Sequence, residues 1–270
     1  MSASPPPPPS PSLLPLSAIV TRLRAAGCVF AEDEAQLLAD TAATPEDLAA
    51  MVDRRVQGLP LEHVLGWAQF HGLRIIVDPG VFVPRRRTEF LADQALALAP
   101  PRGAVIVDLC CGSGALGTAL AAALDEVELY AADIDPAAVR CARRNIADHG
   151  RVYEGDLYRP LPDALRGRVD ILVANVPYVP SGDIPFLPPE AREHEALVAL
   201  DGGADGLDVL RRVTAEARQW LAPGGRLLFE TSDRQVPQAI ETVARDGLVP
   251  EVATCDELDA TVVIGTNPAG

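Results

Sequence analysis

The sequence of 270 residues contains no lysine: all 23 of its basic residues are arginine, against 38 acidic residues, and its formal net charge is -15. We attribute the missing lysine to GC-rich coding, because no mechanism connects it to the structure. The acidic balance disfavours a nucleic acid as the direct substrate, since neutralising phosphates normally requires a basic face.

Cysteines and long apolar runs are also scarce. Five cysteines without a Cys-x-x-Cys pair argue against a disulfide framework and against a zinc site. No run approaches the roughly 18 apolar residues of a membrane span, and no basic region precedes an apolar stretch at the N-terminus. Since 48% of the residues are hydrophobic, the chain can still bury a sizeable core. We therefore predict a globular cytoplasmic protein without a metal site or a membrane contact.

The N-terminal part of the chain divides into two segments. Residues 1–12 are mainly proline and serine, which is typical of a disordered tail. From residue 13 to residue 68, apolar residues recur at helical spacing, and Thr44 followed by Glu46 and Asp47 resembles a helix start. This pattern predicts a small helical domain.

A short β pattern follows the helical segment. Residues 70–83 alternate apolar and polar side chains around Asp78-Pro79-Gly80. That tripeptide is a turn signal between two short strands. We predict a β-hairpin linker over residues 69–90.

The remainder, residues 91–270, has the pattern of an α/β domain. Apolar strands alternate with helical stretches of a dozen or so residues, which is the signature of a doubly wound parallel sheet. The clearest strands span residues 105–109, 127–133, 169–174 and 226–230, and the helices lie near 115–124, 136–149, 207–221 and 236–244. Two late strands, 249–253 and 261–265, are joined by a short connection.

A glycine-rich turn follows the first strand of this domain. Asp108-Leu109-Cys110-Cys111-Gly112-Ser113-Gly114 runs directly into a helix, so its backbone can approach a ligand closely. A tight strand-to-helix turn that binds no ligand would have the same glycine pattern. Asp133, nineteen residues after Gly114 at the end of the second strand, can accept both hydroxyls of a ribose. A nicotinamide dinucleotide stays open at this point, because Gly117 occupies the position of the third glycine that a pyrophosphate usually requires.

The strand over residues 169–174 delivers Asn175-Val176-Pro177-Tyr178 to the carboxyl edge of the sheet, where ligands bind. The tetrapeptide resembles the Asn-Pro-Pro-Tyr motif of methyltransferases that act on planar, conjugated nitrogen, and dehydrogenases have no counterpart. This resemblance selects S-adenosylmethionine as the cofactor. An ordinary turn asparagine is the competing interpretation, which Pro177 and Tyr178 disfavour.

With its surroundings, the motif resembles one family closely, the HemK-type protein-glutamine methyltransferases, which modify peptide-chain release factors. The resemblance covers about residues 37–266. It includes residues 58–66, similar to a Gly-x-Pro segment of the family, residues 83–89, similar to its Pro-Arg-Pro-x-Thr-Glu, and residues 201–207 before a long helix. None of these stretches would be expected in a DNA adenine methyltransferase.

The resemblance implies a class I, Rossmann-like methyltransferase fold with a seven-stranded, mostly parallel sheet that ends in an antiparallel pair. In such enzymes an acidic residue lies near the adenine amino group and an apolar residue against its ring, roles that fall on Asp156 and Leu157. A turn-forming aspartate is the alternative interpretation of Asp156. The complete set of predicted cofactor-binding residues is Asp108, Cys110, Cys111, Gly112, Ser113, Gly114, Asp133, Ile134, Asp156, Leu157 and Asn175.

The resemblance also implies how a glutamine amide would be held. The Asn175 side-chain oxygen and the backbone carbonyl of Val176 would accept the two amide hydrogens, which directs the nitrogen at the methyl group. Tyr178 would pack against the amide plane, and Pro177 keeps the residue before it extended. Asn175, Pro177 and Tyr178 are therefore the predicted catalytic residues, and the same tetrapeptide is predicted to bind the substrate.

Arginines and histidines near the motifs are harder to assign. Arg85 is a further predicted substrate-binding residue, although pairing with Glu89 would explain it equally well. Arg86 and Arg87 read as a solvated stretch. His71 and His194 are isolated polar residues, which we interpret as surface or hydrogen-bonded side chains and not as catalytic groups.

Three residues depart from the family pattern. Val176 replaces the first proline of the Asn-Pro-Pro-Tyr motif, Arg86 replaces a proline, and Glu195-Ala196 stands where the family commonly has Glu-Pro. All three lie at or near the expected substrate side. We therefore predict a divergent branch whose protein substrate need not be the Gly-Gly-Gln loop of a release factor.

Two other classes of function compete with a protein-glutamine methyltransferase. An enzyme acting on the amino group of adenine or of a small molecule would use a similar site, but the acidic charge and the lack of a target-recognition domain disfavour nucleic acid. A non-catalytic binding module could share the fold. The presence of both Asp133 and Asn175 disfavours that second alternative.

Overall fold

The computed structural model describes residues 15–269, and the chain divides into two compact units between Leu65 and Gly66. The predicted tail over residues 1–12 lies outside the described residues. Within the part that is described, no helix is both long enough and apolar enough to span a bilayer.

The first unit is helical. Its helices are α1 (Leu16–Ala25), α2 (Ala31–Thr41), α3 (Pro45–Val56) and α4 (Leu61–Leu65). The side chain of Thr44 accepts a hydrogen bond from the Asp47 amide at 3.1 Å, which caps α3 as the sequence predicts. Arg55 and Glu34 form a buried ion pair at 2.6 Å beside the fully buried Leu38. This unit therefore has a core of its own.

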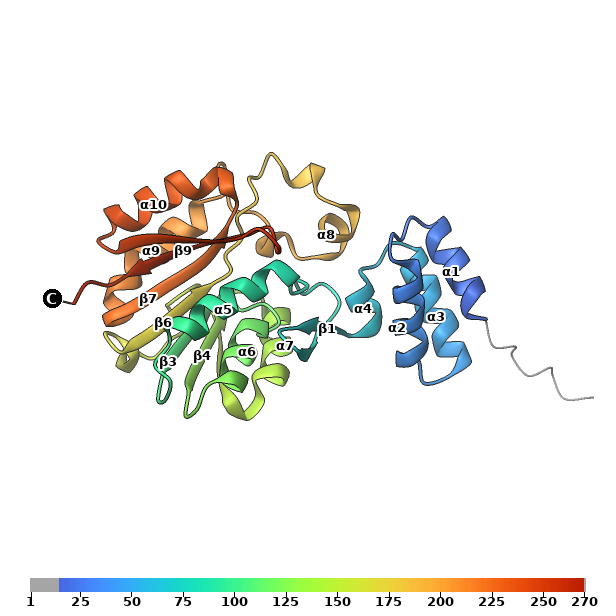
Figure 1. The fold of residues 1–270 in the computed structure, drawn as a ribbon, viewed down its shortest axis with the longest axis horizontal. Coiled ribbons are helices and arrows are strands. Elements are labelled where there is room, and N and C mark those ends of the chain that lie inside the picture. The colour runs from blue at the N-terminus through green and yellow to red at the C-terminus, as the bar shows by residue number, and fades with distance from the viewer. Residues whose placement is uncertain (1–14, 270) are drawn as a thin grey trace, which may run out of the picture. The chain divides into compact units, whose positions relative to one another are not determined.

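The second unit is built on a seven-stranded sheet with strand order β5-β4-β3-β6-β7-β9-β8 (Figure 1). Strands β3 to β7 run parallel, whereas β9 is antiparallel to both β7 and β8. The strands are β3 (Val105–Leu109), β4 (Glu128–Asp133), β5 (Gly150–Glu154), β6 (Val169–Ala174), β7 (Leu221–Thr231), β8 (Val249–Cys255) and β9 (Ala260–Thr266). The predicted class I fold, including its antiparallel pair, is confirmed.

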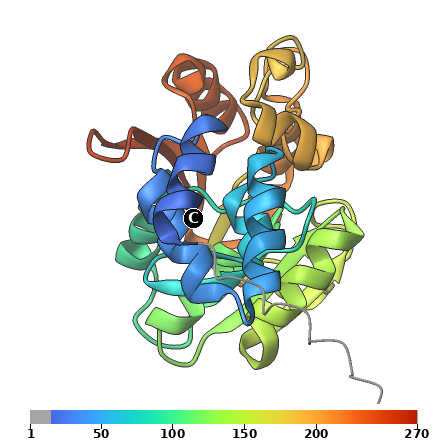
Figure 2. The same cartoon turned by 90° about the vertical axis from the view of Figure 1, so that its right-hand side faces the viewer.

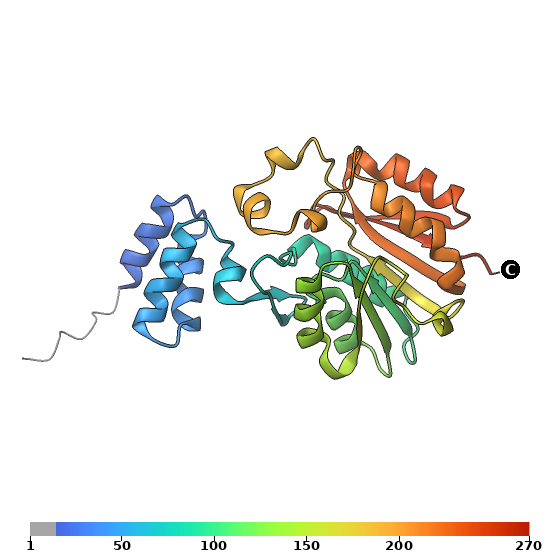
Figure 3. The ribbon, with the colours of Figure 1, turned by 180° about the vertical axis from the view of Figure 1, so that it is seen from behind.

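Helices cover both faces of this sheet (Figures 2 and 3). One layer contains α5 (Glu89–Leu98), α6 (Ala115–Ala123) and α7 (Pro136–Ile146), and the other contains α9 (Asp208–Trp220) and α10 (Val236–Arg245). Strand β3 is buried on both faces: Val107 packs into the core under α9, and Ile106 packs into the core under α6. Such two-sided burial explains the continuous apolar runs of the parallel strands.

The predicted turn of the β-hairpin is wrong. The hairpin consists of β1 (Trp67–Phe70) and β2 (Leu73–Ile76), so its turn is His71-Gly72 and not Asp78-Pro79-Gly80. Both turn residues have positive φ, 49° at His71 and 76° at Gly72, as a two-residue hairpin turn requires. Positive φ is uncommon outside glycine, although histidine adopts it more often than most residues, so His71-Gly72 is a turn signal in the sequence. Asp78 does begin a turn, with its carbonyl accepting from Val81 at 3.1 Å, but no strand follows.

Asn145 on α7 connects the hairpin to the glycine-rich turn. Its side-chain oxygen accepts from the Ile76 amide, and its amide nitrogen donates to the carbonyls of Ile76 and Ser113, each at 2.8 Å. The Cys141 thiol also donates to the Ile76 carbonyl, at 3.1 Å. The hairpin therefore belongs with the sheet unit and steadies one side of the site.

Candidate functional site

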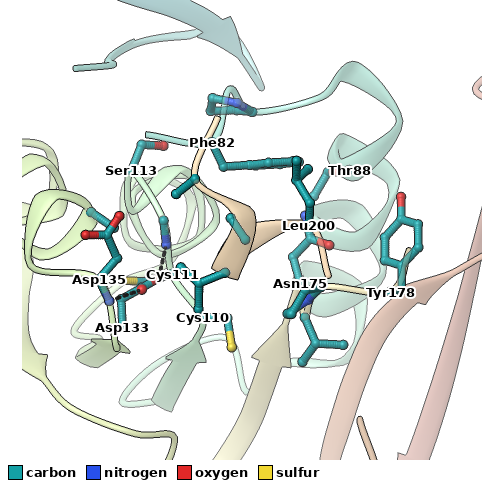
Figure 4. Close-up of a pocket in the computed structure, with 18 of the residues that line it drawn as sticks. Phe82, Thr88, Cys110, Cys111, Ser113, Asp133, Asp135, Asn175, Tyr178 and Leu200 are labelled. Atoms are coloured by element: carbon teal, nitrogen blue, oxygen red, sulfur yellow. Dashed lines mark hydrogen bonds between the residues drawn. The ribbon is translucent and has the colours of Figure 1, made fainter. Parts of the chain in front are cut away.

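A cavity of about 680 Å³ opens at the carboxyl ends of the parallel strands β3, β4 and β6 (Figure 4). Its volume is typical of a small-molecule site. The predicted site residues on its wall are Arg85, Cys110, Cys111, Gly112, Ser113, Asp133, Ile134, Asp156, Leu157, Asn175, Val176, Pro177 and Tyr178. Asp108 and Gly114 were predicted to contact the cofactor, but neither lies on the wall.

The glycine-rich turn forms one wall, and its two glycines serve different purposes. Gly112 has a φ of 55° and nothing within 4 Å of a Cβ position, so it supplies backbone conformation on the open side of the turn. At Gly114, with a φ of 79°, a Cβ would lie 3.1 Å from both Ala142 and Ile146. Gly114 therefore brings the turn close to α7 and does not face the ligand space.

Asp133 ends β4 with both carboxylate oxygens fixed by backbone amides. Oδ2 accepts from Gly112 at 2.8 Å, and Oδ1 accepts from Asp135 at 2.9 Å. Burial raises the pKa of Asp133, and these hydrogen bonds oppose the shift. Each oxygen keeps a lone pair, so the carboxylate can accept two neighbouring hydroxyls of a ligand without moving.

Asp108 lies beneath the turn and positions it. Its Oδ2 accepts from the Gly117 amide at 3.0 Å, while Oδ1 is fully buried without a hydrogen-bond partner among the described residues. Burial raises the pKa of Asp108 to about 7, helped by the charge of Asp133 and opposed by the Gly117 hydrogen bond. The carboxyl group therefore supports the backbone of the turn from behind.

The raised pKa of Asp108 makes the stability of the protein depend on pH. The folded-state pKa of about 7 exceeds the roughly 3.9 of an unfolded aspartate. The contribution of Asp108 to the free energy of unfolding is therefore fully present below about pH 4 and is lost as the pH rises through 7. We expect Asp108→Asn, which cannot ionise, to gain stability relative to the parent over this interval, with a limiting slope of about 1.4 kcal/mol per pH unit. Urea denaturation of the cofactor-free proteins from about pH 4 to 8 measures the difference. A difference that stays constant with pH would contradict this assignment.

Two residues on the cavity wall have strained backbones. Cys110 has a φ of 55° and Leu157 a φ of 50°, although both are non-glycine residues. A non-glycine residue in this region costs of order 1–3 kcal/mol, and such strain collects at functional sites. Burial also raises the pKa of the Cys110 thiol, which keeps it neutral.

Replacing Cys110 by glycine is expected to leave the cofactor-free protein more stable than replacing it by alanine, since both changes lose the packing of the thiol side chain against the core. Relief of the left-handed strain, about 1–3 kcal/mol, exceeds the roughly 0.4–1 kcal/mol that glycine adds to unfolded-state entropy. Cys110→Ala is the matched control, because it removes the thiol and retains the strain. The glycine variant should exceed the alanine variant by about 1 kcal/mol in urea denaturation. Equal stabilities would mean that the conformation at Cys110 carries no strain.

Asp156 makes an ion pair that the sequence did not indicate. Arg212 Nη2 donates to its two carboxylate oxygens at 2.7 and 2.6 Å, and Arg212 also lines the cavity. The backbone of Asp156 begins a turn as well, since its carbonyl accepts from Arg159 at 3.1 Å. Arg212 lies on α9, 56 residues away, so no local pattern could have revealed the pair.

Asn175 follows β6 and lies across the cavity from Asp133 (Figure 4), and the next residue, Val176, also lines the cavity. Among residues 15–269, nothing forms a hydrogen bond with the Asn175 side chain or with the Val176 carbonyl. Val176 as a residue is 2% exposed, and its side chain packs into the core under α9. Two adjacent acceptors are therefore available to a ligand, and the valine side chain is directed into the core.

Tyr178 is fixed by charged residues from two other elements. Its hydroxyl donates to Glu230 Oε1 at 2.9 Å and accepts from the Arg87 guanidinium. Burial and the Glu230 charge raise the pKa of Tyr178, so the hydroxyl keeps its proton. Arg87 is 44% exposed, in line with the predicted solvated stretch, but it also pairs with Glu230 at 2.9 Å, which the sequence did not indicate. Glu230 was not among the predicted site residues.

Arg85 pairs with Glu195, so the alternative of a pair with Glu89 is wrong. Its guanidinium reaches both oxygens of the buried Glu195 carboxylate at 2.7 Å, while Glu89 accepts from the His71 amide. Beside this pair, the Ala196 amide donates to the Gly80 carbonyl at 3.1 Å. Proline lacks that N–H, so the departure at Ala196 adds a hydrogen bond between the two loops.

The histidines do not contribute to the cavity wall. His71 Nε2 lies 2.9 Å from Asp93, with about a quarter of its side chain exposed. No cluster of side chains suited to hold a metal ion occurs within the described residues.

Comparison with known proteins gives consistent matches. The family model described as methyltransferase small domain matches residues 72–184. A release factor glutamine methyltransferase of Geobacter sulfurreducens is 39% identical over 77% of this chain and 74% of its own length. One of Mycolicibacterium smegmatis is 41% identical, over 79% of this chain and 77% of its own length.

Solved structures share the fold at low sequence identity. A methyltransferase from Pyrococcus furiosus has a TM-score of 0.54 at 18% identity, covering 73% of this chain and 90% of its own. A ribosomal protein L11 methylase from Lactobacillus delbrueckii subsp. bulgaricus has a TM-score of 0.52 at 17% identity, covering 71% and 84%. At such identities, the likeness concerns the fold alone.

Proposed function

This chain belongs to the family of release factor glutamine methyltransferases, and we propose that it transfers a methyl group from S-adenosylmethionine to the side-chain amide nitrogen of a glutamine in a release factor. The observation that supports this most directly is the pair of available acceptors at Asn175 and Val176. They share one cavity with the Asp133 carboxylate. A cytoplasmic location is part of the proposal, since a release factor acts on ribosomes.

The residues of the cavity fit the cofactor. Asp133 offers two immobilised carboxylate oxygens for the ribose hydroxyls, and the open side of Gly112 leaves room for close approach. Asp156 and Leu157 would hold the adenine, with Arg212 fixing the orientation of the Asp156 carboxylate through two hydrogen bonds. The cofactor supplies an electrophilic methyl group on a sulfonium.

An amide nitrogen is a weak nucleophile, because its lone pair is delocalised into the carbonyl. Asn175 Oδ1 and the Val176 carbonyl would each accept one amide hydrogen, which orients the nitrogen and stabilises the positive charge that develops on it. Tyr178 would pack against the amide plane. No strong base is needed, because the amide proton becomes acidic once the methyl group has moved.

Valine at position 176 is compatible with this role. The residue contributes its carbonyl, which valine and proline share, and Pro177 keeps residue 176 out of the helical region. Its side chain packs in the core, so the change lies outside the space for the glutamine. Ala196 lines the cavity and Arg86 is exposed next to the cavity residues Arg85 and Arg87, so both departures are placed to influence which protein binds.

We also propose a role for each segment of the chain. Residues 91–270 would form the methyltransferase domain, with the hairpin segment 69–90 supporting its glycine-rich turn through Asn145. The helical domain over residues 13–68 would contribute to recognition of the protein substrate. An adenine substrate is disfavoured by the net charge of -15.

Incubation of the purified protein with release factor and S-adenosylmethionine carrying a labelled methyl group tests the proposal. Mass spectrometry should place the label on one glutamine side chain of the release factor. The same reaction in a cell extract separates the alternatives. Label on a glutamine of another protein would refute only the release factor as the substrate protein. Label on adenine, lysine or a small molecule would refute methylation of an amide nitrogen.

A further inference from the structure

A buried carboxylate lies behind the catalytic tetrapeptide, at the carboxyl end of β7. The side chain of Glu230 is 4% exposed, and the role proposed above for the site does not use it. A buried charge is costly unless its oxygens are paired. The groups that pair it therefore indicate what it does.

Three donors from two segments converge on Glu230. Its Oε1 accepts from Arg87 Nε and from the Tyr178 hydroxyl, both at 2.9 Å, and its Oε2 accepts from the Thr88 hydroxyl at 2.7 Å. Arg87 and Thr88 belong to η1 (Arg86–Thr88), immediately before α5. Both carboxylate oxygens are thus satisfied, and the direction of each hydrogen bond is determined.

Tyr178 is consequently held at both of its ends. The hydroxyl has one acceptor in Glu230 and one donor in Arg87. The backbone carbonyl of Tyr178 accepts from Gln235 Nε2 at 2.9 Å, and the oxygen of the Gln235 side chain accepts from the Ser232 hydroxyl at 2.7 Å. The two residues that hold Tyr178, Glu230 and Gln235, lie at the end of β7 and in the turn of 3-10 helix directly after it.

We propose that Glu230 is a positioning residue for methyl transfer, which acts through the Tyr178 hydroxyl to hold the phenol ring in the one orientation that packs against the substrate amide. The inference rests on the proposed function, because it takes a glutamine side chain as the group that meets the ring. Glu230 itself is not on the wall of the cavity. Its contribution depends on the hydrogen bond to Tyr178.

A purely structural role for Glu230 would also involve Arg87 and Thr88, so the experiment must isolate Tyr178. The variants are Glu230→Gln, Tyr178→Phe and the double variant, assayed on release factor. Glu230→Gln is expected to lower kcat about tenfold, with KM and the dissociation constant for S-adenosylmethionine within about twofold of the parent. In the Tyr178→Phe background, the same substitution should have almost no further effect on kcat.

Tyr158→Phe is the matched control for loss of a buried phenol hydroxyl. Its hydroxyl donates to the Val213 carbonyl at 2.8 Å, and Tyr158 does not line the cavity. The control should lower the melting temperature and leave kcat unchanged. If Glu230→Gln costs the same factor with and without the Tyr178 hydroxyl, or affects only KM, the positioning role is overturned.

A measurement without substrate separates this inference from the proposed function. Because the Tyr178 hydroxyl donates to Glu230, Glu230→Gln should shift the labelled Tyr178 Cζ resonance at neutral pH. The Cζ resonance of Tyr158, whose hydroxyl donates to the Val213 carbonyl, should stay in place. If the parent transfers no methyl group to release factor, the proposed function fails. The comparison of Cζ resonances at neutral pH then decides alone, and an unmoved Tyr178 resonance overturns the coupling.

Discussion

Asn175→Ala is expected to lower kcat about a hundredfold while leaving the dissociation constant for S-adenosylmethionine nearly unchanged. The Asn175 oxygen accepts an amide hydrogen that becomes more acidic as the methyl group arrives, so the lost interaction is stronger in the transition state than in the ground state. Removing one comparable group from an oxyanion hole costs about 10²–10³ in kcat. Because the side chain makes no hydrogen bond within the described protein, its removal should disturb little else.

Asn267→Ala is the control for loss of an asparagine amide elsewhere in the sheet. Asn267 Nδ2 donates to the carbonyls of Leu221 and Ala222 at 3.1 and 3.0 Å, and the residue lies outside the cavity. This variant should be less stable but equally active. Quenched-flow or steady-state methylation of release factor gives kcat for both. Normal turnover by Asn175→Ala would eliminate the acceptor mechanism.

The sheet and its helices could be predicted because their signals are local. Two-sided burial makes β3 and β6 nearly continuous apolar runs, and the helices of the sheet unit have regular spacing. Parallel strands in turn bring their carboxyl ends to one edge, which explains why Asp133 and Asn175 could be assigned to one site. Motifs that are separate in the sequence therefore line one cavity, because the parallel strands end at the same edge of the sheet.

The supports of the site could not be predicted, because their partners are distant in the sequence. Glu230 pairs with Arg87 across 143 residues, and Arg212 pairs with Asp156 across 56. From the local sequence, Glu230 is expected to be a polar residue at the end of a strand, and Arg212 a residue on the solvated face of a helix. The identity of a buried acid's partner depends on the packing of whole elements, which periodicity does not encode.

Backbone strain was equally hidden. Cys110 and Leu157 follow strands at positions where the chain must reverse, and side-chain type gave no reason to expect positive φ at either. At these residues, tertiary packing overrides local preference.

Asp133→Ala is expected to weaken binding of S-adenosylmethionine about a hundredfold without unfolding the protein. Two hydrogen bonds from ribose hydroxyls to a carboxylate, at about 1.5 kcal/mol each, amount to roughly two powers of ten in the dissociation constant. Loss of the acceptor for the Gly112 amide would loosen the glycine-rich turn and add to the effect.

Asp170→Ala provides the contrast that identifies the cause. Asp170 Oδ2 accepts from the Val105 amide at 2.9 Å, so this aspartate also fixes a strand of the sheet, but outside the cavity. Calorimetric titration with S-adenosylmethionine should find the parent affinity in Asp170→Ala and the loss only in Asp133→Ala. An equal loss in both variants would assign the effect to general destabilisation, and unchanged affinity in Asp133→Ala would remove this carboxylate from the cofactor site. Only a loss confined to Asp133→Ala fits a carboxylate that meets the ribose directly.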